Sequence, residues 1–125
     1  MNRTQLTIAI AAIFGLISVI AGAAGAHALR DTLDAGALSA FETAARFQMY
    51  HALALLAVGI LSMRWQTRIL TISAVLFTLG ILLFSGSLYI LALSGIGIFG
   101  AIAPIGGISL MAGWASLALA ALRSN

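Results

Sequence analysis

Residues 69–122 read ILTISAVLFTLGILLFSGSLYILALSGIGIFGAIAPIGGISLMAGWASLALAAL, and these 54 positions contain no charged side chain. Arg68 and Arg123 border the stretch. Because about 20 apolar residues are enough for a helix to cross a bilayer, the stretch is long enough to cross twice. A turn signal, SGIG at residues 94–97, lies near its middle. We therefore predict two antiparallel membrane spans in this part of the chain.

The composition of the whole chain indicates lipid, not water, as the solvent. Hydrophobic residues make up 62% of the 125 residues and charged residues 7%, with a mean hydropathy of +1.15. A soluble domain has about a quarter of its residues charged, and a small one leaves much of its surface exposed to water. The six arginines and three acids are scattered, so the basic stripe that binds nucleic acid is missing. The absence of cysteine excludes disulfides, thiolate catalysis and cysteine metal sites.

The predicted fold is all-α: an integral membrane four-helix bundle with antiparallel, up-and-down helices in a single domain of residues 1–125. We expect spans at about residues 5–26, 48–63, 69–93 and 104–122, with an outward loop at about residues 27–47. The first span resembles a secretory signal, but its uncharged run is longer than a usual signal core. Ser39 and Glu42 fit a capping box at the start of the second helix. Pro104 suits the first turn of the fourth helix, after a short hydrophobic connection.

Arginine placement predicts the orientation of the bundle. With four spans both termini share one side, and that side carries Arg3, Arg64, Arg68 and Arg123. Arg30, Arg46 and all three acids fall on the other side. Because cytoplasmic segments carry the excess of positive charge, we expect both termini in the cytoplasm.

Small residues recur at helical spacing and predict where the helices touch. In lipid the hydrophobic effect does not drive helices together, so close backbone approach must supply the packing energy. In the first span, small residues recur every four positions at Ser18, Gly22 and Ala26. In the third span, they recur every seven positions at Ser73, Gly80 and Ser87. The glycines expected at helix contacts are Gly22, Gly80, Gly86, Gly106 and Gly113. The same faces would serve contacts between subunits, and we expect a homo-oligomer.

Four motifs then point to a family. They are GAAGAHAL at residues 22–29, FETAARFQMYHALA at 41–54, LFSGSLY at 83–89, and PIGG at 104–107 followed by Gly113-Trp114. In this order they closely resemble the domain-of-unknown-function 423 family, the YgdD/YwdK-type small inner-membrane proteins. The resemblance implies a multi-pass plasma-membrane protein and no settled activity. Two positions depart from the family pattern: Ala24 replaces an aromatic residue, and Ala103 replaces a threonine that we would expect to cap the fourth helix.

The motifs meet in the outer half of the membrane and predict a polar cluster there. Its expected core is His27, Gln48, His51 and Ser85, because unpaired polar atoms in hydrocarbon cost several kcal/mol. Ser87 and Tyr89 lie beside it, and the candidate ligand-binding residues are therefore His27, Gln48, His51, Ser85, Ser87 and Tyr89. Glu42 and Arg46 are spaced for an i,i+4 ion pair at the headgroup level. The indole N–H of Trp114 should find a partner inside the bundle.

Several functions fit this cluster. The simplest gives the histidines neutral, hydrogen-bonded roles near helix ends and the serines packing roles. The expected protein is then a structural or ligand- and lipid-binding membrane module. An oligomeric channel or carrier for protons or a small solute is the alternative, and haem binding between two histidines is a more distant one.

Enzymatic function is not expected. The chain has no nucleophile elbow, no paired acids in its spans and no phosphate-binding loop. We predict no metal and no cofactor, membrane lipids as partners, and no nucleic acid.

Overall fold

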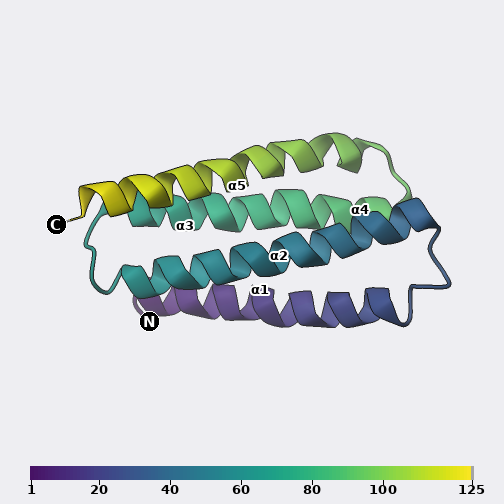
Figure 1. Cartoon of the computed structure of the whole chain (residues 1–125), viewed down its shortest axis with the longest axis horizontal. Helices are drawn as coiled ribbons and strands as arrows, with labels where there is room; N and C mark the ends of the chain where they lie inside the picture. The colour runs from purple at the N-terminus through teal and green to yellow at the C-terminus, as the bar shows by residue number, and fades with distance from the viewer. Residues whose placement is uncertain (125) are drawn as a thin grey trace.

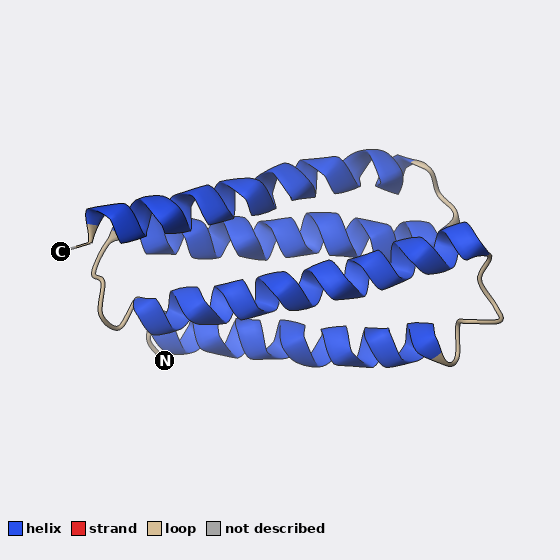
Figure 2. Ribbon diagram, in the orientation of Figure 1, coloured by secondary structure: helices blue, strands red, loops and turns tan. Residues whose placement is uncertain are grey.

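The computed structural model describes residues 1–124. All of its regular secondary structure is helical, with no strand in that range. The helices are drawn in chain order in Figure 1 and joined by short loops in Figure 2. Their bounds are α1 (Arg3–Ala26), α2 (Ala35–Leu61), α3 (Arg68–Gly80), the π-helix η1 (Ile81–Ser85), α4 (Gly86–Ser94) and α5 (Ile98–Arg123). Because α3, η1 and α4 run on without a break, the chain has four helical segments long and apolar enough to cross a membrane. The predicted fold class is confirmed.

The four segments lie antiparallel and in chain order, with both termini at one end of the bundle (Figure 1). α1 packs almost entirely on α2, while α5 packs on α3, η1 and α4. α2 lies between α1 and the third segment, and half of its most apolar window is buried inside the protein, against 17% for α1. The second span is thus the centre of the fold, and α1 is its most lipid-exposed part.

The start of α2 differs from the predicted one. Asp34 is the N-cap, and its carboxylate accepts a 2.8 Å hydrogen bond from the Ala37 N–H. The predicted capping box of Ser39 and Glu42 is wrong, because Asp34 offers a cap about one turn earlier and both residues then lie inside the helix. The loop between the first two spans shortens accordingly to residues 27–34.

The start of α5 also differs. Gly95 ends α4 with a left-handed φ of 72°, and α5 begins at Ile98, so Pro104 lies inside the helix and not in its first turn. The predicted connection before Pro104 is helical, and Ala103 is a buried helical residue that could not have been an N-cap. An internal proline lacks the N–H that would bond the carbonyl four residues earlier, a loss that membrane helices tolerate when neighbouring groups compensate.

The π-helix η1 was not predicted. A π-turn holds one residue more than an α-turn, and such insertions often mark functional or strained positions. Side chains beyond it are therefore rotated from the places they would have in an uninterrupted α-helix. Before η1, Ser73 and Gly80 face α5; at its end, Ser85 faces α2. The seven-residue spacing of Ser73, Gly80 and Ser87 read in the sequence assumed an uninterrupted α-helix.

Three of the five predicted contact glycines lie where helices touch. A Cβ at Gly106 would meet backbone atoms of Phe84 and Leu83, and one at Gly80 or Gly113 would meet Leu110 or Phe77. The predicted contacts at Gly22 and Gly86 are wrong, because nothing lies within 4 Å of a Cβ built on either residue. α1 instead buries Ser18, Ala21 and Gly25, an alternating three- and four-residue spacing that turns Gly22 outward. Gly59, which packs on Ile8, was missed.

Gly106→Ala should destabilise the bundle by about 1–3 kcal/mol, because the added methyl group would meet backbone that cannot rotate away. Gly107→Ala is the matched control, since its Cβ would meet only the Phe84 ring at 3.7 Å. Thermal unfolding in mild detergent measures both variants. Equal midpoints for the two would contradict the close approach of α5 to the third segment.

Candidate functional site

Buried polar side chains gather along α2, the central helix. Gln48 and His51 lie one turn apart on it and are 3% and 6% exposed. Ser18 on α1 and Ser85 at the end of η1 approach from either side. We call Gln48, His51, Ser85, Tyr89 and Trp114 the polar lock, because each of these side chains joins two helices.

Gln48 uses both ends of its amide. Its Nε2 donates to the Phe14 carbonyl oxygen on α1 at 2.8 Å, and its Oε1 accepts a 2.8 Å hydrogen bond from the Tyr89 hydroxyl on α4. The Tyr89 ring also makes an edge contact with Phe41, with ring centroids 5.0 Å apart. One side chain of α2 therefore connects the first span to the third.

His51 is held in a single neutral form. An indole N–H is only a donor, so the 3.1 Å contact from Trp114 Nε1 makes His51 Nε2 the acceptor. Nδ1 then carries the proton and donates to the Phe47 carbonyl at 2.6 Å. This confirms that Trp114 has a partner inside the bundle. It also leaves His51 with both ring nitrogens occupied.

Serine hydroxyls add further hydrogen bonds between helices. Ser18 and Ser85 donate to consecutive carbonyls of α2, those of Ala45 (2.6 Å) and Ala44 (2.8 Å). Ser73 donates to the Gly113 carbonyl at 2.9 Å. Across residues 1–124, every fully buried side-chain nitrogen or oxygen has a hydrogen-bond partner. Since lipid offers no such partners, these bonds are the reason the polar residues can be buried at all.

The structure brings together most of the predicted cluster but not His27. Gln48, His51, Ser85 and Tyr89 lie on neighbouring turns, and Ser87 is buried nearby. His27 is exposed and caps the end of α1. It lies 13 residues beyond Phe14, about 20 Å along the helix at 1.5 Å per residue. A histidine at a helix end near water needs no buried partner, so its predicted place in the cluster is wrong.

The predicted ion pair of Glu42 and Arg46 also differs. In the part of the chain that the structure describes, no such pair forms; Arg46 Nη2 lies 3.5 Å from the Thr43 hydroxyl. Both side chains are exposed, and an exposed pair gains too little free energy to fix its geometry.

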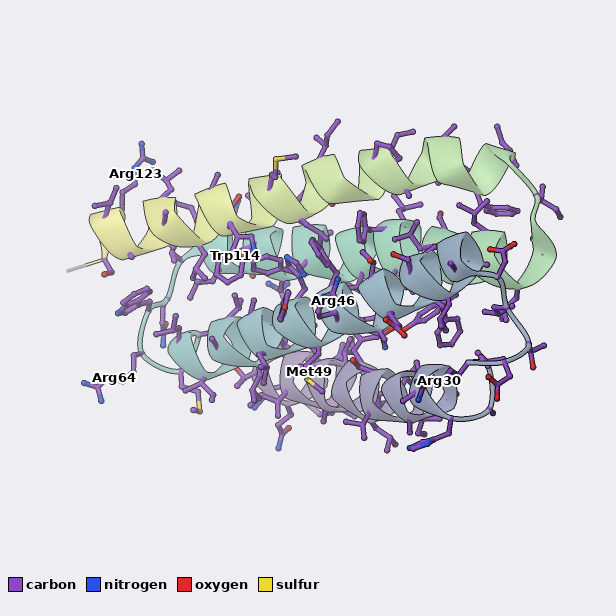
Figure 3. The ribbon with its side chains drawn as sticks, turned by 45° about the vertical axis from the view of Figure 1, so that its right-hand side comes forward. Arg30, Arg46, Met49, Arg64, Trp114 and Arg123 are labelled. Atoms are coloured by element: carbon purple, nitrogen blue, oxygen red, sulfur yellow. The ribbon has the colours of Figure 1, made fainter. Side chains whose placement is uncertain are left out.

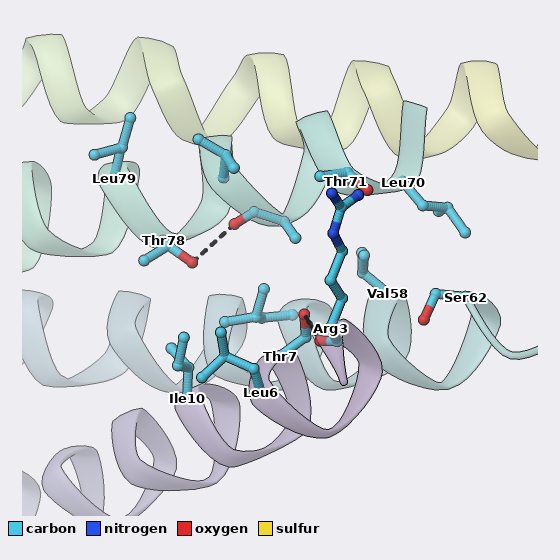
Figure 4. Close-up of a pocket in the computed structure, with 13 residues that line it drawn as sticks. Arg3, Leu6, Thr7, Ile10, Val58, Ser62, Leu70, Thr71, Thr78 and Leu79 are labelled. Carbon is cyan, nitrogen blue, oxygen red and sulfur yellow. Dashed lines mark hydrogen bonds between the residues drawn. The ribbon is translucent and has the colours of Figure 1, made fainter. Parts of the chain in front are cut away.

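A groove between α1, α2 and α3 was not predicted. It has a volume of about 310 Å³ and lies at the end of the bundle that carries the termini (Figure 4). Its interior is formed by aliphatic side chains, including Ile10, Leu55, Val58 and Leu70. The stripe Thr71, Ala74, Val75 and Thr78 on one face of α3 was the available signal, because small side chains at helical spacing leave room beside the helix.

The groove is polar at its mouth and apolar inside. Arg3, Ser62 and Thr71 lie at the mouth, where α1 starts, α2 ends and α3 starts. Deeper in, Thr78 bonds its hydroxyl to the Ala74 carbonyl of its own helix at 2.8 Å (Figure 4). Its hydroxyl is therefore already paired within α3.

Fold and site together define a class: a multi-pass helical membrane protein whose spans are joined by internal hydrogen bonds. The chain belongs to the family described as "Protein of unknown function (DUF423)", whose model matches residues 21–107. It is 45% identical to a UPF0382 membrane protein of Staphylococcus saprophyticus, over 95% of this chain and 98% of the relative. It is 41% identical to the UPF0382 inner membrane protein YgdD of Escherichia coli K12, over 90% and 86%. No solved structure matches the chain.

The family and the plasma-membrane location predicted from the sequence are thereby confirmed. The relatives' names state a membrane location and no activity.

A double-mutant cycle should detect the bond between Gln48 and Tyr89. We expect Gln48→Leu and Tyr89→Phe to be non-additive by about 0.5–2 kcal/mol, the range for hydrogen bonds between membrane helices. Tyr50→Phe is the control, because Tyr50 is 51% exposed and should combine additively with Gln48→Leu. Unfolding free energies measured by denaturant titration in mixed micelles give both values. Additivity in both pairs would show that this part of the polar lock is not formed.

Proposed function

We propose that this protein is a non-enzymatic membrane module that holds a membrane lipid in the groove between α1, α2 and α3. The observation that carries the proposal is the groove itself. Leu6, Val75 and Leu79 on its rim are exposed, and the medium around them in a bilayer is lipid. A volume of about 310 Å³ falls at the lower end of the range for ligand sites, about 300–1,000 Å³.

The polar lock has a structural role in this proposal. A ligand at Gln48 or His51 would have to break bonds that each side chain already makes within the bundle. Replacing them would leave a buried donor or acceptor unpaired, at a cost of about 1–3 kcal/mol per group. The groove has no such cost, because its deeper lining is aliphatic.

The same bonds weigh against the two other candidate functions. Axial haem ligation through His51 Nε2 would require Trp114 to move away. Proton passage would require a chain of groups free to exchange partners, whereas Gln48 and Ser85 bond to backbone carbonyls of helices. We therefore favour lipid binding over both transport and haem binding.

We also propose that both termini face the cytoplasm. Figure 3 shows Arg64 and Arg123 at the end that carries the C-terminus, and Arg30 toward the opposite end. Arg3 and Arg68 begin α1 and α3 at the same end as Arg64 and Arg123. Four arginines against two is the asymmetry that sets orientation in the membrane.

Labelling can test this orientation cleanly because the chain has no cysteine. In intact cells, a membrane-impermeant maleimide should label Thr32→Cys in the loop between α1 and α2. It should label Ser124→Cys only after the membrane is permeabilised. The reverse pattern would overturn the proposed orientation.

We further propose that this protein forms a homo-oligomer through α1. Gly15 and Gly22 lie on one side of α1, seven residues apart, and a Cβ on either would meet nothing within 4 Å. Small residues at that spacing allow a second helix to approach closely in lipid. The subunit number seen by native mass spectrometry decides this point.

Filling the groove should abolish lipid retention. Ala74→Leu adds bulk from the groove wall, and Val75→Trp adds it from the exposed rim, where the fold is least affected. We expect native mass spectrometry from mild detergent to show bound lipid on the parent protein and a loss of at least about tenfold in both variants, as for a ligand deprived of about 1.4 kcal/mol. Ala115→Leu, on the exposed side of α5, is the control and should retain lipid. Unchanged retention in both groove variants would contradict the proposed site.

A further inference from the structure

We propose that the groove selects an anionic phospholipid, with the phosphate at Arg3 and Thr71 and one acyl chain in the aliphatic interior. This inference rests on the proposed lipid-binding function and adds the chemical class of the ligand. It is argued from three features: the charge distribution along the bundle, the position of Arg3, and the change of polarity along the groove.

The acidic side chains of the bundle are confined to one end. All three acids, Asp31, Asp34 and Glu42, lie in or near the loop between α1 and α2. The 24 residues of α1 place that loop about 36 Å from Arg3 at 1.5 Å per residue. Charges are screened over about 8 Å at physiological ionic strength. No acidic side chain among the described residues is therefore close enough to neutralise Arg3.

Arg3 is the charged residue among those that line the groove. Figure 4 shows its side chain reaching from α1 across the mouth toward Thr71 on α3. A guanidinium group offers paired N–H donors that match two oxygens of a phosphate, and a threonine hydroxyl adds one more donor. The mouth is thus suited to a phosphate group.

The rest of the groove distinguishes a lipid from a free anion. Beyond Arg3, Ser62 and Thr71 the lining is aliphatic apart from Thr7 and Thr78, whose hydroxyls bond to carbonyls of their own helices. This part of the groove faces the bilayer, where acyl chains are at hand. The acyl chain already lies in hydrocarbon, so it gains dispersion contacts with the aliphatic lining, which a free phosphate could not make. A phosphate that carries an acyl chain uses both parts of the site.

The net charge of the headgroup follows from the surrounding arginines. Arg64, Arg68 and Arg123 all lie at the same end of the bundle as Arg3. A choline or ethanolamine headgroup would bring its own cation into this positive region, and like charges there are unfavourable. A phosphatidylglycerol headgroup has no cation. In the proposed orientation this end also faces the cytoplasmic leaflet, where basic residues attract anionic lipid.

The test uses the full chain in nanodiscs that contain phosphatidylglycerol and phosphatidylcholine in equal amounts. Native mass spectrometry after release into mild detergent gives the ratio of the two lipids retained. We expect the parent to favour phosphatidylglycerol, and Arg3→Gln to lower that preference about fivefold, the effect of about 1 kcal/mol for one interfacial arginine. Arg3→Lys should keep part of the preference. Arg123→Gln, at the same end but outside the groove, should keep all of it.

Each other outcome has a distinct meaning. Lipid retained with equal affinity for both headgroups would overturn the inference and leave the proposed function standing. An equal loss in Arg3→Gln and Arg123→Gln would overturn it in favour of general surface attraction. Displacement of the retained lipid by inorganic phosphate alone would overturn it in favour of a free-anion site. No lipid retained by the parent would instead overturn the proposed function itself.

Discussion

The hydrogen bonds of α2 are the constraint on which the rest of the bundle depends. Hydrocarbon supplies no partner for a polar atom, so Gln48 and His51 can be buried only because backbone carbonyls and aromatic donors on other helices meet them. Serines on both sides add bonds to consecutive carbonyls of the same helix. Each bond requires a particular register between two helices. Together they fix α2 between the first and third spans, with no ion pair between the helices among residues 1–124.

The helices of the bundle are held together by hydrogen bonds between helices and by close contacts at glycines. The groove lies between two helices that make neither kind of contact. Gly106 and Gly113 bring α5 into close contact with the third segment, and Gly59 brings α2 close to α1. α1, however, packs on α2 and hardly on α3, and the facing residues of α3 include Thr71 and Ala74. The space between α1 and α3 therefore stays open along their shared flank, in an otherwise closely packed protein.

The sequence was sufficient for the fold and for most of the polar lock, because both follow from hydrophobic length and from the need to pair polar groups. It predicted a partner for Trp114, and the partner is His51. The sequence predictions were wrong at the starts of two helices, where a residue nearby in the chain determined the helix start in place of the predicted one. Asp34, and not Ser39, is the N-cap of α2. α5 begins at Ile98, N-terminal to Pro104, and not at the proline. The groove was missed because an empty space depends on how three helices sit together, and Thr71, Ala74 and Thr78 reveal it only once α1 is in place.

The π-helix at Ile81–Ser85 divides the third span into two α-helical parts, α3 and α4, and changes the rotation of one relative to the other about the helix axis. A π-turn takes one more residue than an α-turn to complete about the same rotation, so returning these five residues to ordinary α-helical geometry would rotate everything after them by about 100°. Tyr89 would then point away from Gln48, while Ser73 would still face α5. The backbone geometry of this single turn, more than the identity of any side chain in it, decides whether the segments before and after it can be in register with their neighbours at once.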